Sequence, residues 1–223
     1  MKRGNSLIDV KIHKLLEIRN LTDTGYVLRM EKNDFNFLPG QYISLGKEGS
    51  IDKRDYSIYS SPHDPFLEVL IRAVPDGTVS RNLQKLKPGA GLEVEGPFGF
   101  FQLKQGASKD THFLFVASGT GISPFHSMIT SNPELNYTLV HGVRFGKEAY
   151  EKQVYPKAKI QVCASRDGQG DYYGRVTDYL KEHPVSKDSL CYLCGNSDMI
   201  NDVFDILESQ GIPSENIHAE VYF

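Results

Sequence analysis

The periodicity of the sequence changes near residue 106, and this change limits most strongly how the chain can fold. Before it, apolar and polar residues alternate over short stretches bounded by Gly, Pro, Asn and Asp. After it, short apolar runs alternate with segments of helical spacing. The first pattern is typical of antiparallel strands, and the second of a parallel sheet covered by helices. The sequence therefore predicts an α+β chain of two domains, an antiparallel β-barrel or sandwich at 1–105 and an α/β domain at 106–223.

The predicted elements follow from these two patterns. In the first part we expect a helix at 80–86 and strands at 10–18, 26–30, 42–45, 67–73 and 92–94. In the second part we expect strands at 112–117, 137–141, 159–164, 189–194 and 217–222, and helices at 124–130, 147–154, 175–181 and 197–210. Parallel sheets bind ligands beyond the carboxyl ends of their strands. The candidate binding loops therefore start near Ser118, Gly142, Ser165 and Gly195.

Charge and cysteine content exclude several classes of protein. Residues 1–105 hold 15 Lys and Arg against 13 Asp and Glu, and residues 106–223 hold 10 against 15. This mild asymmetry argues against non-specific nucleic-acid binding. Three cysteines, an odd number, fit a reducing compartment better than a disulfide framework. The apolar runs are far shorter than the roughly 20 residues of a membrane span. We therefore expect a cytoplasmic protein with no nucleic-acid partner and no membrane span.

The segment Arg54-Asp55-Tyr56-Ser57-Ile58-Tyr59-Ser60 brings three kinds of side chain together. A flavin needs a fixed charge for its phosphates, a flat wall for its ring and a hydrogen-bond donor near its reacting nitrogen. Arg54, Tyr56 and Ser57 supply these three. Ser80, at the start of the predicted helix, would offer its hydroxyl and backbone N–H groups to phosphate. The same residues also fit an ordinary strand with a surface ion pair and a capping serine.

A glycine turn joins a strand to a helix at Ser118-Gly119-Thr120-Gly121-Ile122-Ser123-Pro124. Glycines let the backbone approach a pyrophosphate closely, and proline suits the first turn of a helix. The pattern is neither a Walker loop nor Gly-x-Gly-x-x-Gly. A plain turn between a strand and a helix explains it equally well.

Three arginines are predicted near strand ends in the second part. Ser165 and Arg166 end one predicted strand, Arg175 opens the next helix, and Arg144 follows another strand. Together they could bind a dianionic phosphate such as the 2′-phosphate of NADP. Asp167 follows directly and complicates this interpretation. Taken singly, each arginine also fits a solvated surface position.

The pair Cys191 and Cys194 does not predict a metal site. Strand alternation turns the two thiols to opposite faces, Cys163 is the third and last cysteine, and no Cys and His pair completes a ligand set. Cys194 ends a predicted strand and would lie beside the ligand crevice. The alternative is a buried and inert thiol.

Taken together and in order, these segments resemble the ferredoxin–NADP reductase family over nearly the whole chain. The segment from Arg54 to Ser60 is similar to the family's flavin signature, and Cys194-Gly195-Asn196-Ser197-Asp198-Met199 to its last nucleotide-binding motif. Further similar segments are the flavin-phosphate segment Val74-Pro75-Asp76-Gly77-Thr78-Val79-Ser80-Arg81-Asn82-Leu83, the turn Gly96-Pro97-Phe98-Gly99, the nucleotide loop Gly119-Thr120-Gly121-Ile122-Ser123-Pro124 and the ending Glu220-Val221-Tyr222.

The resemblance implies a flavoenzyme that uses FAD and NADP(H). Tyr56 and Tyr222 would cover the two faces of the flavin ring, with Phe223 beside Tyr222. Catalytic positions would be Ser57, Cys194, Glu220 and Tyr222. The remaining cofactor-binding positions would be Arg54, Gly77, Thr78, Val79 and Ser80 for flavin, and Gly119, Thr120, Gly121, Arg144, Ser165, Arg166, Arg175 and Gly195 for the nucleotide.

Such an enzyme would pass a hydride from NADPH to the flavin, and single electrons to or from ferredoxin or flavodoxin. Two alternatives stay open from the sequence. One is a reductase component of a monooxygenase, or an NAD(P)H:flavin reductase, with the same first half-reaction. The other is a non-catalytic subunit that binds flavin or nucleotide and senses redox state.

Overall fold

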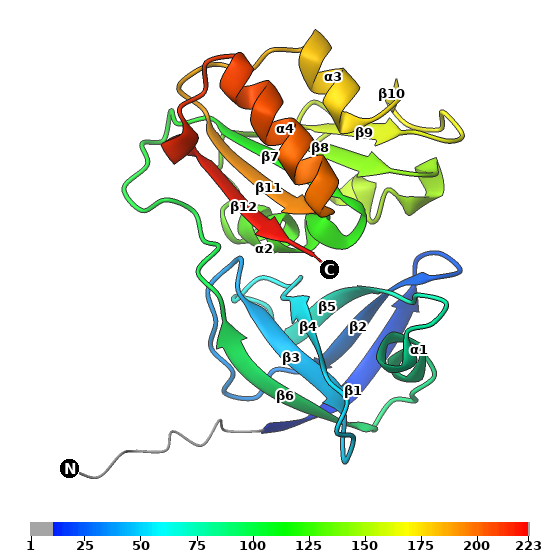
Figure 1. Ribbon diagram of the computed structural model, residues 1–223. Coiled ribbons are helices and arrows are strands. Elements are labelled where there is room, and N and C mark those ends of the chain that lie inside the picture. The colour runs from blue at the N-terminus through cyan, green and yellow to red at the C-terminus, as the bar shows by residue number, and fades with distance from the viewer. Residues whose placement is uncertain (1–10, 223) are drawn as a thin grey trace, which may run out of the picture.

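The computed structural model describes residues 11–222, which form two sheets stacked end to end and joined by one long connection (Figure 1). The first part contains β1 (Lys11–Asn20), β2 (Gly25–Glu31), β3 (Tyr42–Lys47), β4 (Arg54–Ser57), β5 (Phe66–Arg72), α1 (Thr78–Gln84) and β6 (Gly91–Phe98). The second contains β7 (Phe113–Ser118), α2 (Ser123–Ser131), β8 (Tyr137–Val143), β9 (Ile160–Ala164), β10 (Tyr172–Tyr173), α3 (Val176–Glu182), β11 (Leu190–Gly195), α4 (Ser197–Ser209) and β12 (Ile217–Val221).

The first sheet is antiparallel and closes into a barrel. Its strand order is β4-β3-β6-β1-β2-β5. Just after β4, Ile58 bridges Val69 of β5, and the Tyr59 amide donates to the Glu68 carbonyl at 2.8 Å. This contact joins the two edge strands, so the predicted barrel is confirmed. Closure leaves no long free edge on this sheet.

The second sheet is parallel, with the order β10-β9-β8-β7-β11-β12. The central strands β7 and β11 are buried on both faces, as strands of a parallel sheet usually are. The helix α2 covers the face turned toward the barrel, and α3 and α4 cover the other face (Figure 1). The predicted two-domain fold is confirmed, whereas the boundary at residues 105 and 106, between β6 and β7, stays a prediction.

One hydrophobic cluster runs across both parts of the molecule. Phe115 and Phe125 of the second part share it with Val27, Tyr59 and Leu70 of the barrel. Buried polar contacts reinforce this junction, as the Ser127 hydroxyl of α2 donates to the Ser60 carbonyl at 2.7 Å. The packing therefore fixes how the two sheets sit relative to one another.

Two helix predictions differ from the structure. The helix expected at 80–86 is α1, which begins two residues earlier because the chain already turns at Gly77, whose amide donates to the Val74 carbonyl. The helix expected at 147–154 is wrong. That stretch forms two short 3₁₀ turns, Gly146–Glu148 and Lys152–Val154, separated by Glu151, whose left-handed backbone interrupts the α-helical hydrogen-bond ladder. The two edge strands β4 and β10 were not in the predicted set.

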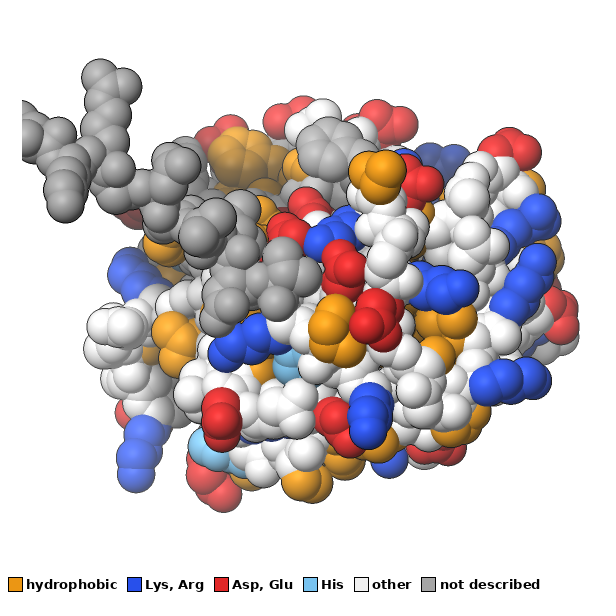
Figure 2. Space-filling model, turned by 90° about the horizontal axis from the view of Figure 1, so that it is seen from below, with side chains coloured by type: hydrophobic (Ala, Val, Ile, Leu, Met, Phe, Trp, Pro, Cys, Tyr) orange, Lys and Arg blue, Asp and Glu red, His pale blue; other side chains and the backbone are white. Residues whose placement is uncertain are grey.

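The barrel face opposite the second sheet carries interspersed acidic and basic side chains with scattered hydrophobic ones (Figure 2). Within residues 11–222, no helix has both the length and the apolar character needed to cross a bilayer.

Candidate functional site

Two cavities meet at the junction of the sheets. The first, of about 560 Å³, lies at the carboxyl ends of the parallel strands, and the second, of about 570 Å³, lies at the adjoining end of the barrel. The four candidate binding loops all reach the first cavity, through Ser118, Gly142, Ser165 and Gly195. Three residues line both cavities: Arg72, Thr120 and Tyr222. Tyr222 therefore stands between the two spaces.

The four predicted catalytic residues come together at this junction. Ser57 ends β4, and its hydroxyl donates to Glu220 Oε2 at 3.2 Å. Cys194 of β11 lies opposite Glu220 in the parallel register of β12, and the Tyr222 hydroxyl lies close to both Ser57 and Cys194. Cys194 is fully buried and lines neither cavity. It lies beneath the site rather than on its surface.

Burial changes the ionisation of this cluster. Burial raises the pKa of Glu220 to about 7, although the hydrogen bond from Ser57 lowers it. Burial also raises the pKa of Cys194 well above its ordinary value, so Cys194 is a neutral thiol at physiological pH. The hydroxyl of Tyr222 is buried without a well-aligned hydrogen-bond partner among the described residues. Such an orphaned group marks a place where a ligand would supply the missing partner.

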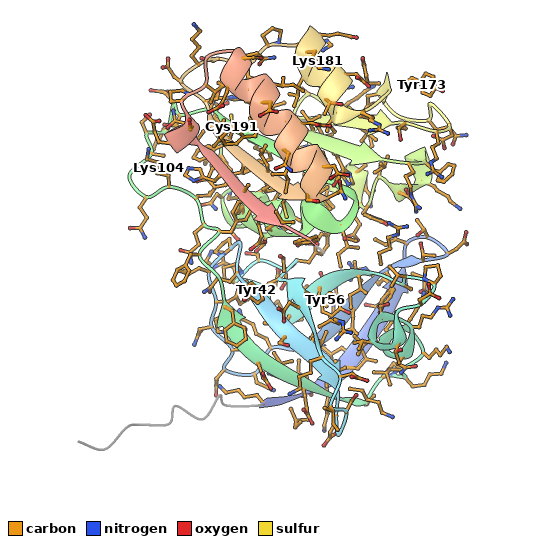
Figure 3. All side chains as sticks on the ribbon, in the orientation of Figure 1. Tyr42, Tyr56, Lys104, Tyr173, Lys181 and Cys191 are labelled. Atoms are coloured by element: carbon orange, nitrogen blue, oxygen red, sulfur yellow. The ribbon has the colours of Figure 1, made fainter. Side chains whose placement is uncertain are left out.

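The predicted flavin residues lie mostly on one wall of the barrel cavity. Arg54, Tyr56 and Ser57 all line it, and Tyr42 joins them from the neighbouring strand β3 (Figure 3). Arg54 is exposed, and burial raises the pKa of Tyr56 to about 12, so its hydroxyl stays neutral. A cation next to an aromatic wall and a buried hydroxyl fits the phosphate, ring and reacting edge of a flavin.

The predicted flavin-phosphate segment lies beside this cavity rather than on it. Gly77 caps α1, and Thr78, Val79 and Ser80 form its first turn. Ser80 is buried, and its hydroxyl accepts from the Val74 amide at 3.4 Å. From this segment, Val74 reaches the cavity lining.

Two glycines of the nucleotide loop are required by close packing. A side chain at Gly121 would collide with the Cys194 carbonyl at 2.3 Å, and one at Gly195 would collide with Ser118 Oγ at 2.2 Å. Gly195 also has a φ of +133°, which only glycine adopts readily. The loop Gly119–Ile122 is a 3₁₀ turn pressed against the end of β11, and Gly119 and Thr120 line the nucleotide-side cavity.

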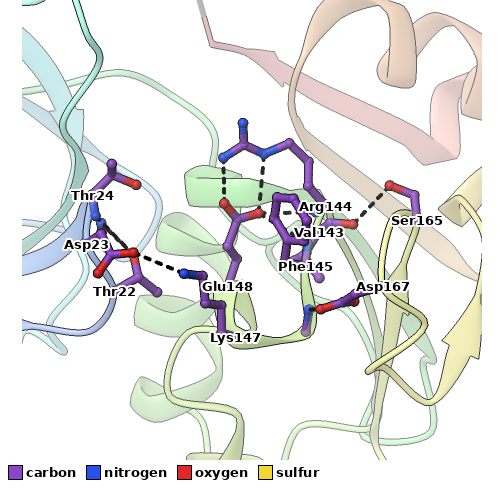
Figure 4. A network of polar contacts seen from close by, with 12 residues as sticks. Thr22, Asp23, Thr24, Val143, Arg144, Phe145, Lys147, Glu148, Ser165 and Asp167 are labelled. Carbon is purple, nitrogen blue, oxygen red and sulfur yellow. Dashed lines mark hydrogen bonds and ion pairs between the residues drawn. The ribbon is translucent and has the colours of Figure 1, made fainter.

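The three predicted arginines and Ser165 line the first cavity together. Arg144 is ion-paired with Glu148 at 2.5 Å, and Glu148 also accepts from the Arg144 amide (Figure 4). Within residues 11–222, neither Arg166 nor Arg175 forms an ion pair, and both are exposed. Of the three predicted arginines, these two are the ones open to a dianionic ligand.

Asp167 is hydrogen-bonded outside the first cavity. Its carboxylate accepts from the Gly146 amide at 3.0 Å and from the Gln169 amide at 3.1 Å, and it does not line the cavity (Figure 4). Phe223, the other predicted aromatic of the ring face, lies outside the described residues.

Several residues that line the cavities were not among the predicted site residues. Arg72 ends β5 and lines both cavities. In the sequence it is a cation at the end of an apolar strand, just before the Val74 segment, and this pattern could have indicated a site residue. Asn196 lines the first cavity, and its side chain caps α4 through the Asp198 amide at 3.0 Å. Glu148 lies in a segment wrongly predicted as an α-helix, so its role beside Arg144 could not be foreseen.

The chain matches two family profiles. Residues 14–103 match the oxidoreductase FAD-binding domain, and residues 115–205 match the oxidoreductase NAD-binding domain. It is 31% identical over 214 residues to the flavodoxin/ferredoxin–NADP reductase of Escherichia coli (strain K12), covering 85% of this chain and 86% of that protein. It is also 31% identical to the toluate 1,2-dioxygenase electron transfer component of Pseudomonas putida, covering 92% of this chain but 65% of that protein.

The fold is shared with a solved structure of a ferredoxin NADP⁺ reductase from Neisseria gonorrhoeae with bound FAD and NADP. The TM-score is 0.85 at 20% sequence identity, and the match covers 96% of this chain and 99% of that one. At this level of identity, the comparison shows the common fold.

Proposed function

The chain belongs to the flavodoxin/ferredoxin–NADP reductase family, a family of flavin-dependent oxidoreductases that use FAD and NAD(P)H, and from this premise we propose how its residues work. Arg54, Tyr56 and Ser57 would hold FAD in the barrel cavity, and Arg166 and Arg175 would hold NADPH in the cavity of the parallel sheet. Tyr222 marks the junction at which a hydride would pass between the two. The observation that supports this most directly is that Ser57, Glu220 and Tyr222 converge where the two cavities meet.

The bound flavin supplies the electron chemistry, which is the conversion of a two-electron hydride into single electrons. The protein's part is to position the reacting groups and to tune their protonation. Tyr56 forms the wall of the flavin cavity, and the Ser57 hydroxyl presents one oriented donor at its buried end. Glu220, with a pKa of about 7, holds or releases a proton next to that donor. Arg166 and Arg175 would hold the 2′-phosphate of NADPH, and Arg72, which lines both cavities, would contact the dinucleotide from the barrel side.

Tyr222 acts as a gate. We expect Tyr222→Ser to tighten NADP⁺ binding to the oxidised protein, because the tyrosine ring lines both cavities and competes with the nicotinamide for the same place. Titration of the FAD-loaded protein with NADP⁺, followed by difference absorbance, measures this affinity.

Phe100→Ser is the matched control. Phe100 is an aromatic residue that is 98% exposed and lines neither cavity, so its removal should leave NADP⁺ affinity unchanged. Weaker or unchanged binding in Tyr222→Ser would show that this side chain does not cover the nicotinamide site.

The whole function is tested by mixing the protein with NADPH under anaerobic conditions. We expect the absorbance of bound FAD near 450 nm, about where free flavins absorb, to bleach rapidly. Reduced ferredoxin or flavodoxin should then accumulate when either carrier is added. Bleaching by NADPH without electron transfer to either carrier would favour the alternative function of an NAD(P)H:flavin reductase. Absence of bleaching would refute the hydride step.

A second candidate carrier system follows from the similarity to the toluate 1,2-dioxygenase electron transfer component. In that case the reduced flavin would deliver electrons to an oxygenase system. Repeating the experiment with an oxygenase component as the acceptor separates the two candidates, because only the preferred carrier should be reduced at a rate matching flavin reoxidation.

All three cysteines are free and buried, which supports a location in the reducing cytoplasm.

A further inference from the structure

A cluster of polar side chains joins the two sheets away from both cavities. Glu151, in the loop after β8, accepts from Arg19 Nη2 of β1 at 3.0 Å and from the Tyr59 hydroxyl at 2.8 Å. Arg19 is also ion-paired with Glu68, which Arg29 binds through Nε at 2.7 Å. None of these residues lines either cavity. The cluster therefore has no direct part in the reaction.

The backbone of Glu151 is held in an unusual conformation. Its φ of +46° and ψ of +35° lie in the left-handed region, which residues other than glycine and asparagine rarely adopt. Such strain persists when surrounding contacts hold it in place. Here the carboxylate is directed at two barrel residues, so the strained position connects the second sheet to the barrel.

A short and rigid path leads from this cluster to the flavin side of the site. Tyr59 follows Ser57 by two residues, and its ring stacks on His126 of α2, with ring centroids 3.8 Å apart and planes inclined by 10°. The helix α2 follows directly after the nucleotide loop Gly119–Ile122. A shift at Tyr59 would therefore move Ser57 relative to that loop.

A second path leads to the nucleotide side. Glu151 directly follows Tyr150, and both Tyr150 and Glu148 line the first cavity. The bond from Arg19 thus anchors the segment that carries Glu148, the partner of Arg144. One carboxylate is connected to the walls of both cavities.

We propose that Glu151 is a positioning residue that holds the nicotinamide cavity in line with the flavin cavity by bridging Arg19 and Tyr59. The inference rests on the proposed function, because it assumes that a hydride crosses between the two cavities. Hydride transfer needs the donor and acceptor atoms near contact distance, and a misplacement of about 1 Å can slow such a reaction roughly 100-fold. Loss of the bridge should slow the transfer without changing how either cavity binds its own ligand.

The test compares Glu151→Ala and Glu151→Gln with wild type as FAD-loaded proteins. We expect flavin reduction at saturating NADPH to be about 10- to 100-fold slower in Glu151→Ala. Glu151→Gln can still accept from the Tyr59 hydroxyl but loses the ion pair with Arg19. Its rate of flavin reduction should therefore lie between those of wild type and Glu151→Ala. The affinity for adenosine 2′,5′-bisphosphate should stay unchanged, because that probe occupies the first cavity alone. The long-wavelength absorbance of stacked nicotinamide and flavin should weaken.

Lys152→Gln is the matched control. This variant breaks the neighbouring ion pair between Lys152 and Asp171. Because both residues belong to the second part of the chain, the reduction rate and the long-wavelength absorbance should stay unchanged. If Glu151→Ala does not fold, Tyr59→Phe removes one of the two bonds and should still slow reduction.

Two results would overturn the inference. One is a wild-type rate of flavin reduction in the Glu151 variants, or in Tyr59→Phe where Glu151→Ala does not fold. The other is an equal loss of bisphosphate affinity, which would mean general damage. Failure of wild type itself to be reduced by NADPH would instead refute the proposed function, so the two failures are distinguishable.

Discussion

Ser57→Ala is expected to slow flavin reduction by NADPH about 100- to 1,000-fold while FAD stays bound, the loss typical of removing one oriented donor from a reacting site. Ser57 is only 4% exposed, at the end of the barrel cavity. FAD should remain bound because Arg54 and Tyr56 line the same cavity independently of this hydroxyl. Stopped-flow absorbance of the flavin measures the rate, and the protein-bound flavin content measures retention.

The variant has a second expected signature in its pH profile. The Ser57 hydroxyl stabilises the charged form of Glu220, so its loss should raise the pKa of Glu220 above about 7. The inflection that Glu220 contributes to the rate profile should therefore move to higher pH. Ser44→Ala makes the same change on the neighbouring strand β3, outside the cavity lining. It should alter neither the rate of flavin reduction nor the pH of the inflection. Equal reduction rates in Ser57→Ala and wild type would remove Ser57 from the mechanism.

Arg166→Ala should change cofactor preference rather than general activity. We expect kcat/KM for NADPH to fall about 10- to 150-fold, since one charge-assisted hydrogen bond is worth roughly 1.5–3 kcal/mol. NADH lacks the 2′-phosphate and should be nearly unaffected. Arg166 is exposed in the first cavity, stacked over the Phe145 ring at 5.7 Å, whereas Arg144 is already neutralised by Glu148. Steady-state kinetics with both cofactors measure the effect.

Lys181→Ala is the control for this change. It removes one positive charge from an exposed position of α3 outside the cavity, so it tests whether long-range charge alone explains the result. An equal loss of kcat/KM for NADPH and NADH in Arg166→Ala, or a wild type that already prefers NADH, would contradict the assignment of the 2′-phosphate to Arg166.

The sequence predicted the second sheet well because buried parallel strands appear as short apolar runs. The strands β7, β8, β9, β11 and β12 begin and end within two residues of their predicted limits. Their carboxyl ends meet at one edge by geometry, so the four candidate loops could be brought together without any knowledge of side-chain contacts. The barrel was predicted as a class, but its closure through Ile58 and Val69 depends on a long-range pairing that no local pattern encodes.

The wrong helix at 147–154 has a physical explanation. Its residues have helical spacing, but the Glu148 carboxylate accepts from the amides of Arg144 and Phe145 and tightens the first turn to 3₁₀. Glu151 then turns left-handed toward the barrel. Both effects depend on partners outside the segment. The role of Glu151 was unpredictable for the same reason, since its contacts with Arg19 and Tyr59 form only once the two sheets are placed together.

The hydrophobic cluster shared by both sheets has a consequence for how the protein folds. Val27, Tyr59 and Leu70 of the barrel complete the packing around Phe115 and Phe125 of the second part. Separating the parts would expose these side chains to water at a cost of roughly 25 cal/mol for each Å² of apolar surface. The two sequence regions that match separate family profiles are thus coupled in their stability through this shared cluster, while each also packs a cluster of its own residues.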